Sequence, residues 1–469
     1  MKVDFSKLDR AFSPKCLVVV GDKRESNYMW LRAHADFKGK LYSVQIDPSE
    51  IEGIEEMGVK NFKSILDIPE PVDLAIVAVP RGIAPRVLDD LIKKDVAAAH
   101  FFTAGFSETH TEEGNQLEQI ITGKAEAANF HLVGPNCMGI FNPSLGVGAE
   151  MGYTNEGGEV GLISQSGTHA VTFNQEAHLE GPEIYKSVSF GNGIVLDSPD
   201  YLEYFGQDPG IKVIGMYLEG VKDGQRFLRV LREVAARKPV VIWKGGRTEE
   251  GDRAIASHTG SLAVSHTIWD TAVKQCGAIK VNRLEELIDT LKALLYLSPV
   301  TGNRVAITGG SGGQSVAIAD VFSEAGLKVP TLSKESHQEL ESFYNLVGGG
   351  YLNPIDTGNT NRRELGRIAE ILERDSNTDS LAMIVNTRFG PRVPLEPVVE
   401  LLTDIRQKNS KPVLAILPSS FSTEEVKLAG DTMKKLHAGG VPGFVSLERG
   451  AFALRKAIDY YNLKKSPDS

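Results

Sequence analysis

The sequence predicts an α/β protein built from three doubly wound domains, and three observations support this prediction. Short apolar runs that end in glycine or polar residues recur along the chain, as at 16–21, 160–164 and 304–309. Helical patterns separate these runs, and such alternation is typical of parallel sheets covered by helices. The chain has 469 residues, which is too long for one hydrophobic core and predicts about three domains.

The first domain is expected over residues 1–148. Apolar runs at 16–20, 41–46, 74–79, 98–103 and 131–133 predict its strands, with helical patterns at 85–94 and 114–121 between them. Parallel sheets bind ligands at the carboxyl ends of their strands. Glycine, small residues and Lys or Arg follow these strands, which suits a nucleotide-like ligand with phosphates, although ordinary loop chemistry is an open alternative. Neither GxGxxG after Gly21 nor GxxxxGK[ST] occurs, so no P-loop is predicted.

Two turn-rich segments, 144–158 and 299–303, mark the expected boundaries of the other domains. The middle domain, 149–299, has predicted strands at 160–164, 213–219 and 239–244 and helices at 268–277 and 284–297. The last domain, 300–469, has predicted strands at 304–308, 381–386 and 412–417 and helices at 315–326, 396–407 and 448–460. The strand–glycine–helix opening at 160–167 recurs at 304–313, which indicates an internal repeat of one βα architecture.

Composition excludes several classes of protein. The formal net charge of −10 predicts no nucleic-acid interface. Three cysteines lie far apart without a CxxC pair, which argues against a disulfide framework or a zinc site. We expect no metal site in this chain. No leader-like start and no long apolar run are present, so a cytoplasmic protein without a membrane segment is expected.

The segment 256–263, Ala-Ser-His-Thr-Gly-Ser-Leu-Ala, is the candidate centre of the chemistry. Neutral imidazole is a good nucleophile, and it needs a partner that fixes its tautomer. A phosphate carried on His258 would need backbone N–H groups from a helix N-terminus. Glu219 and the glycine turn at 164–167 both end predicted strands and could supply these groups. On spacing alone, an ordinary loop histidine and a solvated carboxylate remain open alternatives.

A series of short motifs occurs along almost the whole chain in a specific order and spacing. They lie at 70–80, 104–106, 134–136, 164–167, 191–192, 217–220, 244–247, 257–263 and 353–356. Through these motifs the chain resembles the alpha subunit of the ADP-forming (NDP-forming) acyl-CoA synthetases, relatives of succinyl-CoA synthetase. The resemblance implies a Rossmann-like CoA-binding domain at 1–148, a ligase domain with a phosphohistidine loop at 149–299 and a second, flavodoxin-like ligase domain at 300–469.

The resemblance also implies a reaction and a set of site residues. The reaction is acyl-CoA + ADP + phosphate ⇌ carboxylic acid + CoA + ATP, through an acyl phosphate and a phosphohistidine. His258 would be the phosphorylated residue and Glu219 its orienting carboxylate. Two helix openings would bind the phosphoryl group, through Ser164, Gln165, Ser166, Gly167, Gly309, Gly310, Ser311, Gly312 and Gly313. Coenzyme A would contact Gly21, Lys23, Arg24, Ser26, Pro48, Val79, Pro80, Ala104, Gly105 and Asn136.

The resemblance implies a partner as well. Three α/β domains leave no room for an ATP-grasp module, so ATP or ADP and Mg²⁺ are expected on a separate beta subunit of a hetero-oligomer, with a small carboxylic acid or acyl-CoA as substrate. One alternative is a CoA- or acyl-CoA-binding regulatory paralogue without ligase turnover, suggested by the charged loop 22–27. Another is a nicotinamide-dependent dehydrogenase that uses residues 16–140, which the missing GxGxxG disfavours.

Overall fold

The computed structural model describes residues 2–148, 157–259, 266–310, 312–344, 352–357, 362–386, 395–408, 411–418 and 422–465, with the backbone alone at 256–259, 266–267, 312 and 362–363. The chain forms two compact units. The first comprises residues 1–178 and 183–282, and the second comprises residues 179–182 and 283–469. Among the described residues, no helix is long and apolar enough to cross a membrane.

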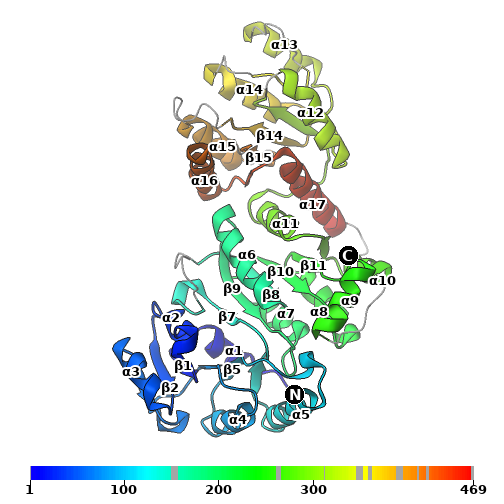
Figure 1. Ribbon diagram of the computed structural model, residues 1–469. Helices are drawn as coiled ribbons and strands as arrows, with labels where there is room; N and C mark the ends of the chain where they lie inside the picture. The colour runs from blue at the N-terminus through cyan, green and yellow to red at the C-terminus, as the bar shows by residue number, and fades with distance from the viewer. Residues whose placement is uncertain are drawn as a thin grey trace. The chain divides into compact units, whose positions relative to one another are not determined.

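The first sheet of unit 1 is a parallel six-stranded sheet of order β3-β2-β1-β4-β5-β6. This is the Rossmann order, in which the chain reverses direction across the sheet between β1 and β4. Figure 1 labels strands β1, β2 and β5 of this sheet. All five residues of β1 are buried, as expected for a central strand covered on both faces. The strands are β1 (Cys16–Val20), β2 (Lys40–Val44), β3 (Lys60–Phe62), β4 (Leu74–Val77), β5 (Ala98–Phe101) and β6 (His131–Val133), and the helices are α1 (Phe5–Phe12), α2 (Met29–Arg32), α3 (Pro48–Glu56), α4 (Ala84–Lys93) and α5 (Glu112–Ala127).

The second sheet of unit 1 has the order β12-β11-β10-β8-β9-β7. Five of its strands are parallel in the flavodoxin order, which places a switch point between β8 and β10. The sixth, β7, pairs antiparallel with β9 and was not expected from the sequence. The strands are β7 (Gly139–Phe141), β8 (Val160–Ser164), β9 (Ile184–Ser189), β10 (Val213–Leu218), β11 (Val240–Lys244) and β12 (Ile279–Val281), and the helices are α6 (Gly167–Glu180), α7 (Ser198–Gln207), α8 (Gly224–Ala235), α9 (Glu249–Thr259) and α10 (His266–Gln275).

One hydrophobic core joins the two sheets of unit 1. Leu17 and Val19 of β1 belong to the same buried cluster as Ile163 of β8. At this junction α1 packs on α7, where the ring of Phe12 contacts that of Phe205 edge-on with centroids 5.5 Å apart. The sheets of unit 1 therefore hold their carboxyl-end turns in a fixed relation to each other.

Unit 2 contains a parallel four-stranded sheet of order β13-β14-β15-β16. Helix α11 packs on α17, and both helices belong to unit 2. The domain boundary that we expected at residue 299 stays a prediction. The strands are β13 (Val305–Thr308), β14 (Ser380–Ile384), β15 (Val413–Ile416) and β16 (Gly443–Phe444), and the helices are α11 (Leu284–Tyr296), α12 (Gly312–Glu324), α13 (Lys334–Phe343), α14 (Arg362–Arg374), α15 (Glu396–Lys408), α16 (Thr423–Ala438) and α17 (Leu447–Lys465). The three sheets, which are parallel except for β7, confirm the predicted fold class.

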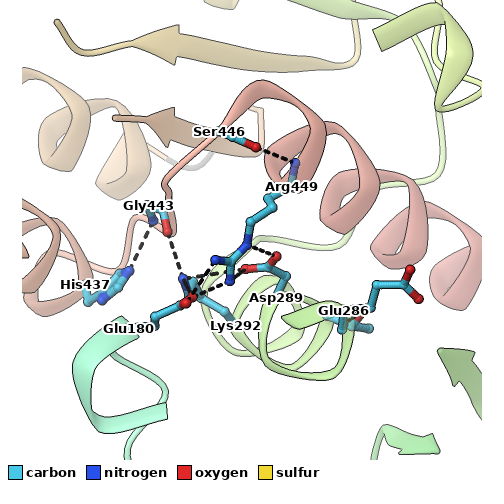
Figure 2. A network of polar contacts seen from close by, with 9 residues as sticks. Glu180, Glu286, Asp289, Lys292, His437, Gly443, Ser446 and Arg449 are labelled. Carbon is cyan, nitrogen blue, oxygen red and sulfur yellow. Dashed lines mark hydrogen bonds and ion pairs between the residues drawn. The ribbon is translucent and has the colours of Figure 1, made fainter. Parts of the chain in front are cut away.

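A buried network of charges lies in unit 2, where α11 meets α17 (Figure 2). Lys292 is fully buried and donates to Gly443 O at 3.0 Å and to Glu180 Oε2 at 3.2 Å. Arg449 donates to both carboxylate oxygens of Asp289, at 2.5 and 2.8 Å, and also to Glu180. Two cations thus neutralise two carboxylates, which is the condition under which buried charges are tolerated.

We expect Arg449→Met to destabilise unit 2 by about 3 kcal/mol, because it leaves two carboxylates against one buried ammonium. The exposed pair Lys435–Glu396 supplies the control, and Lys435→Met should cost less than about 1 kcal/mol. Chemical denaturation should be followed by far-UV circular dichroism, since all three tryptophans lie in unit 1. Equal midpoints for the two variants would contradict a stabilising role for the network.

Two buried histidines are held neutral by backbone N–H groups. His34 Nδ1 lies 2.7 Å from Trp30 O, and Nε2 accepts from Gly148 N at 2.9 Å. Burial lowers the pKa of His34 to about 4. His437 Nε2 accepts from Gly443 N at 3.1 Å, and burial lowers its pKa to about 3. If Nε2 of either histidine took up a proton, the new N–H would point at the backbone N–H group that now donates to it.

Because the folded pKa of His34 lies below its unfolded value, its stabilising contribution is complete above about pH 6.5 and is lost as the pH falls towards 4. We expect His34→Gln to reduce the pH dependence of unit 1 stability by about 1.4 kcal/mol per pH unit in that window. Urea unfolding followed by tryptophan fluorescence measures this slope. His110→Asn, at an exposed position whose left-handed backbone (φ 55°) suits asparagine, should leave the slope unchanged. A slope unaltered in His34→Gln would refute the assignment.

Candidate active site

A groove of about 490 Å³ lies at the switch point of the first sheet, between the turns that follow β1 and β4. This size is within the range of small-molecule and cofactor sites. At its base Gly21 has φ 86°, and a Cβ there would lie 2.5 Å from Val79 Cγ1, so only glycine permits this approach of the two turns. We call it the switch groove. It is lined by Gly21, Asp22, Lys23, Glu25, Ser26, Met29, Trp30, Ala78, Val79, Pro80, Arg81, Phe102, Thr103, Ala104 and Asn136.

The buried carboxylate of Asp22 fixes the loop on one side of the switch groove. It accepts from Leu31 N at 2.9 Å, from Lys23 N at 3.1 Å and from Ser26 Oγ at 3.2 Å. Burial raises the pKa of Asp22, against these hydrogen bonds. The charged loop 22–27 is therefore held by the carboxylate of Asp22, which the sequence analysis did not single out.

Seven of the ten residues expected to contact coenzyme A line the switch groove: Gly21, Lys23, Ser26, Val79, Pro80, Ala104 and Asn136. The other three lie outside its lining. Arg24 is exposed, Pro48 begins α3, and Gly105 O accepts from Arg81 Nη1 at 2.8 Å. Gly105 thus positions Arg81, which lines the groove. Arg81 follows a predicted strand with the other Lys and Arg residues that suit phosphates, although it was not among the expected contacts. A groove of this size with Lys23 and Arg81 at its edge fits a ligand that carries phosphates.

A second groove of about 220 Å³ lies at the N-terminus of α6, and we call it the α6 groove. It is lined by Phe102, Asn136, Cys137, Met138, Gln165, Ser166, Gly167, Thr168, Gly191 and Asn192. Phe102 and Asn136 line the switch groove as well, so the two grooves adjoin. Gly191 (φ 51°) makes this junction possible, because a Cβ there would lie 2.3 Å from the carbonyl oxygens of Pro135 and Asn136.

The α6 groove fits an anion. The first N–H groups of a helix have no partner within the helix, and the helix dipole adds partial positive charge at the same end. Ser166 Oγ accepts from His169 N at 3.3 Å and thereby caps the helix. Gln165, Ser166 and Gly167 all line the groove, as expected. Ser164 lies beneath it, fully buried, and donates to Ser166 O at 2.7 Å.

The Gln165 side chain crosses the switch point of the second sheet. Its Oε1 accepts from Glu219 N at 2.8 Å and from Gly220 N at 3.1 Å. Glu219 is 8% exposed, and its Oε1 accepts from Tyr217 Oη at 3.3 Å. The buried ammonium of Lys244 donates to Glu219 O at 2.8 Å. The backbone and the side chain of Glu219 are thus held by hydrogen bonds from Gln165, Tyr217 and Lys244.

A cluster of three rings borders Glu219. The ring centroid of His169 lies 4.4 Å from that of Tyr217 and 4.6 Å from that of Trp243. Burial lowers the pKa of His169, and the nearby Glu219 opposes this effect. Burial likewise lowers the pKa of Lys244. These desolvated surroundings strengthen electrostatic interactions at the end of β10.

His258 lies in the last turn of α9 rather than in a loop. Thr248 Oγ1 accepts from Gly251 N at 3.1 Å, and Glu249, Glu250 and Asp252 stabilise the first turn. Such start signals favour a helix that continues to Thr259, which the sequence analysis did not anticipate. The side chain of His258 lies outside the described residues, as do residues 260–265.

The second glycine-opened helix lies in unit 2, at the end of β13. Gly309 has φ 101°, and its N–H donates to Thr357 Oγ1 at 3.0 Å. Gly310 O accepts from Thr357 N at 3.2 Å. Gly312 and Gly313 form the first turn of α12, whereas Ser311 lies outside the described residues. A helix N-terminus is thus present here as predicted.

Within the described residues, no group of three or more His, Cys, Asp or Glu side chains is arranged to hold a metal ion. The three cysteines are free and buried. The described site can bind an anion at the α6 N-terminus beside the fixed carboxylate of Glu219.

Two protein-family models match the chain. A CoA binding domain matches residues 15–143, and a succinyl-CoA ligase like flavodoxin domain matches residues 157–294. The first contains the switch groove, and the second contains α6 and Glu219. These matches confirm the Rossmann-like and flavodoxin-like assignments.

Similar proteins extend over nearly the whole chain. The alpha subunit of acetate–CoA ligase [ADP-forming] II from Pyrococcus furiosus is 34% identical, with 93% of this chain and 94% of that protein covered. Acetate–CoA ligase [ADP-forming] from Methanocaldococcus jannaschii is 31% identical, with 97% of this chain and 63% of that protein covered. The dinucleotide forming acetyl-coenzyme A synthetase 1 of Ca. Korarchaeum cryptofilum, solved with phosphate and ADP, superposes with a TM-score of 0.82 at 28% identity and covers 97% of both chains. This chain belongs to the ADP-forming acyl-CoA synthetases, nucleotide-dependent acid–CoA ligases, and corresponds to their alpha subunits.

Proposed function

We propose that this chain interconverts an acyl-CoA and a small carboxylic acid through an acyl phosphate and a phosphohistidine at His258. The observation that carries the proposal is the junction of the two grooves at Phe102 and Asn136. A CoA thioester bound in the switch groove would present its reacting end to the α6 N-terminus. There, phosphate would be bound beside Glu219.

The proposed reaction has two transfers on this chain, of the acyl group to phosphate and of the phosphoryl group to His258. A phosphate oxygen attacks the thioester carbonyl carbon, the C–S bond breaks, and CoA leaves as a thiolate that takes up a proton. An imidazole nitrogen of His258 then attacks phosphorus, and the P–O bond to the acyl group breaks to release the carboxylate. The N–H groups at the start of α6 offset the charge on the equatorial oxygens, since phosphoryl transfer depends on positioning and charge neutralisation.

Glu219 would fix the tautomer of His258. A carboxylate that accepts from one ring nitrogen leaves the other with its lone pair free to attack phosphorus. The 8% exposure of Glu219 and its bond from Tyr217 Oη support this role, because a fixed and desolvated carboxylate orients an imidazole at little entropic cost. The glycine turn at 309–313 would be the second phosphoryl-binding helix opening.

The nucleotide and Mg²⁺ would bind to an ATP-grasp beta subunit in a hetero-oligomer. The names of two relatives support this proposal, since both are alpha subunits. Phosphohistidine would then pass its phosphoryl group to the terminal phosphate oxygen of ADP. We also propose a cytoplasmic location, where free cysteines such as these three stay reduced. None of the similar proteins supports the regulatory alternative.

We expect His258→Asn to abolish phosphate incorporation and to reduce acid–CoA ligation by on the order of 10³-fold or more, because asparagine offers no comparable nucleophile. The protein, purified with its partner subunit, should be incubated with acetyl-CoA and inorganic phosphate and examined by intact-mass spectrometry. His110→Asn, the same exchange at an exposed site, should take up one phosphoryl group like the wild type. Phosphate incorporation by His258→Asn would rule out the proposed intermediate.

Gln165 offers a matched pair of variants. We expect Gln165→Leu to lower the thermal midpoint and the turnover, because Glu219 N and Gly220 N lose their acceptor at a cost of about 1–3 kcal/mol. Gln165→Glu keeps an acceptor and should keep the thermal midpoint. It places a negative charge beside the phosphate site, so turnover should still fall by on the order of tenfold or more. Thermal denaturation and initial rates of acetyl-CoA formation test both. Wild-type turnover in Gln165→Glu would contradict anion binding at this turn.

A further inference from the structure

The linings of the switch groove and the α6 groove share two residues, Phe102 and Asn136. In the proposed reaction, the CoA sulfur reaches the site from the first groove, and the attacking phosphate oxygen lies in the second. The thioester carbonyl carbon is bonded to that sulfur and forms its new bond to that oxygen, so it must lie where the grooves adjoin. Phe102 and Asn136 therefore border the carbonyl group during acyl transfer.

Acyl transfer creates a negative charge that this junction must stabilise. When a phosphate oxygen bonds to the carbonyl carbon, the electron pair of the C=O bond moves onto the carbonyl oxygen. A hydrogen-bond donor aimed at this oxygen lowers the barrier. Phe102 has no such donor, and its ring packs edge-on against that of Trp30, with centroids 5.1 Å apart. Of the two shared residues, only Asn136 carries a side-chain N–H.

The backbone of Asn136 is held firmly between β6 and β7. Its N–H donates to Thr103 O at 3.1 Å, and its carbonyl oxygen lies where a Cβ on Gly191 would come within 2.3 Å. Its φ of 58° is in the left-handed region, which asparagine tolerates better than most residues. The side chain of Asn136 thus starts from a fixed point at the junction of the grooves.

The fold does not use the side-chain amide of Asn136. This amide makes no hydrogen bond to any residue that the structure describes, and it is not among the described buried polar atoms that lack a partner. Asn192, which also lines the α6 groove, is engaged instead. Its Nδ2 donates to Glu108 Oε2 at 2.7 Å and to Glu118 Oε2 at 3.1 Å. The half-buried Asn136 is therefore the asparagine whose donor is available to a ligand.

From these observations we propose that Asn136 is a catalytic residue, whose amide N–H donates to the thioester carbonyl oxygen during acyl transfer to phosphate. The inference rests on the proposed function, which supplies the thioester and the phosphate. Once the O–C bond to phosphate has formed, the electron pair on the carbonyl oxygen re-forms C=O, the C–S bond breaks, and the CoA thiolate takes up a proton. Asn136 serves this step and not the later transfer to His258, in which phosphorus and nitrogen react.

The test separates acyl transfer from phosphoryl transfer. The protein, purified with its partner subunit and free of nucleotide, is phosphorylated in two ways. Acetyl-CoA with inorganic phosphate requires both transfers, whereas acetyl phosphate requires the second alone. Intact-mass spectrometry of quenched samples gives both rates, and His258→Asn sets the background. We expect Asn136→Gly to lower the acetyl-CoA rate by on the order of 100-fold or more and the acetyl phosphate rate by less than about threefold.

Asn129→Gly is the matched control, because Asn129 also has a left-handed backbone (φ 47°) but is exposed and lines neither groove. Both of its rates should equal those of the wild type. Glycine adopts positive φ without strain, so the exchange at 136 should preserve the backbone. In case Asn136→Gly does not fold, Asn136→Asp keeps the shape of the side chain without an N–H donor.

The deciding quantity is the ratio of the acetyl-CoA rate to the acetyl phosphate rate, which should fall in both variants of Asn136. A ratio that stays at the wild-type value in a folded variant would overturn the inference, even if both rates fall together, because a merely structural role would slow both transfers. Failure of the wild type to take up phosphate from either donor would instead refute the proposed function, and this inference with it.

Discussion

The site depends on one side chain that crosses the switch point of the second sheet. Two parallel strands that are neighbours in the sheet but distant in sequence, β8 and β10, end side by side. Gln165 follows the first strand, and its Oε1 accepts from two consecutive N–H groups after the second. This pair of hydrogen bonds couples the N-terminus of α6 to Glu219. The sheet topology and the Gln165 amide group therefore fix the position of the anion site relative to the Glu219 carboxylate.

A second constraint brings the two grooves of unit 1 together. Strand β6 ends the first sheet, and β7 pairs antiparallel with β9 in the second, so the segment at 134–138 connects the two sheets directly. Gly191 then lies against the carbonyl oxygens of Pro135 and Asn136, at a distance that excludes any side chain. Because of this contact, the end of the switch groove and the start of α6 share Asn136 in their linings. Two binding sites on separate sheets thus become adjacent.

The sequence was a good guide wherever strand periodicity and glycine turns determine the structure. The strand ends predicted from apolar runs led to Gly21, Val79 and Gln165, since carboxyl ends of parallel strands meet at one edge. It was a poor guide where contacts join residues distant along the chain. Asp22 looked like one charge in a charged loop, and its burial follows from tertiary packing alone. Strand β7 is only three residues long, too short for a periodic signal.

The helical position of His258 was missed for another reason. The Thr-Gly-Ser sequence that follows it is typical of a loop, whereas the acidic first turn and Thr248 start a helix that reaches Thr259. Start signals ten residues upstream outweighed local composition, because helix formation is cooperative once nucleated. The resemblance identified the residue, and periodicity alone gave no means of distinguishing it from an ordinary histidine.

Buried charges in unit 2 and the start of α6 in unit 1 meet their electrostatic needs in different ways. In the network around Lys292 and Arg449, every charge faces an opposite charge, so the folded chain satisfies itself there. The first N–H groups of α6, by contrast, have no partner within the helix, and they border the α6 groove. Donors and partial positive charge at the edge of a groove suit an anion that comes from outside the chain, which a self-neutralised network does not need.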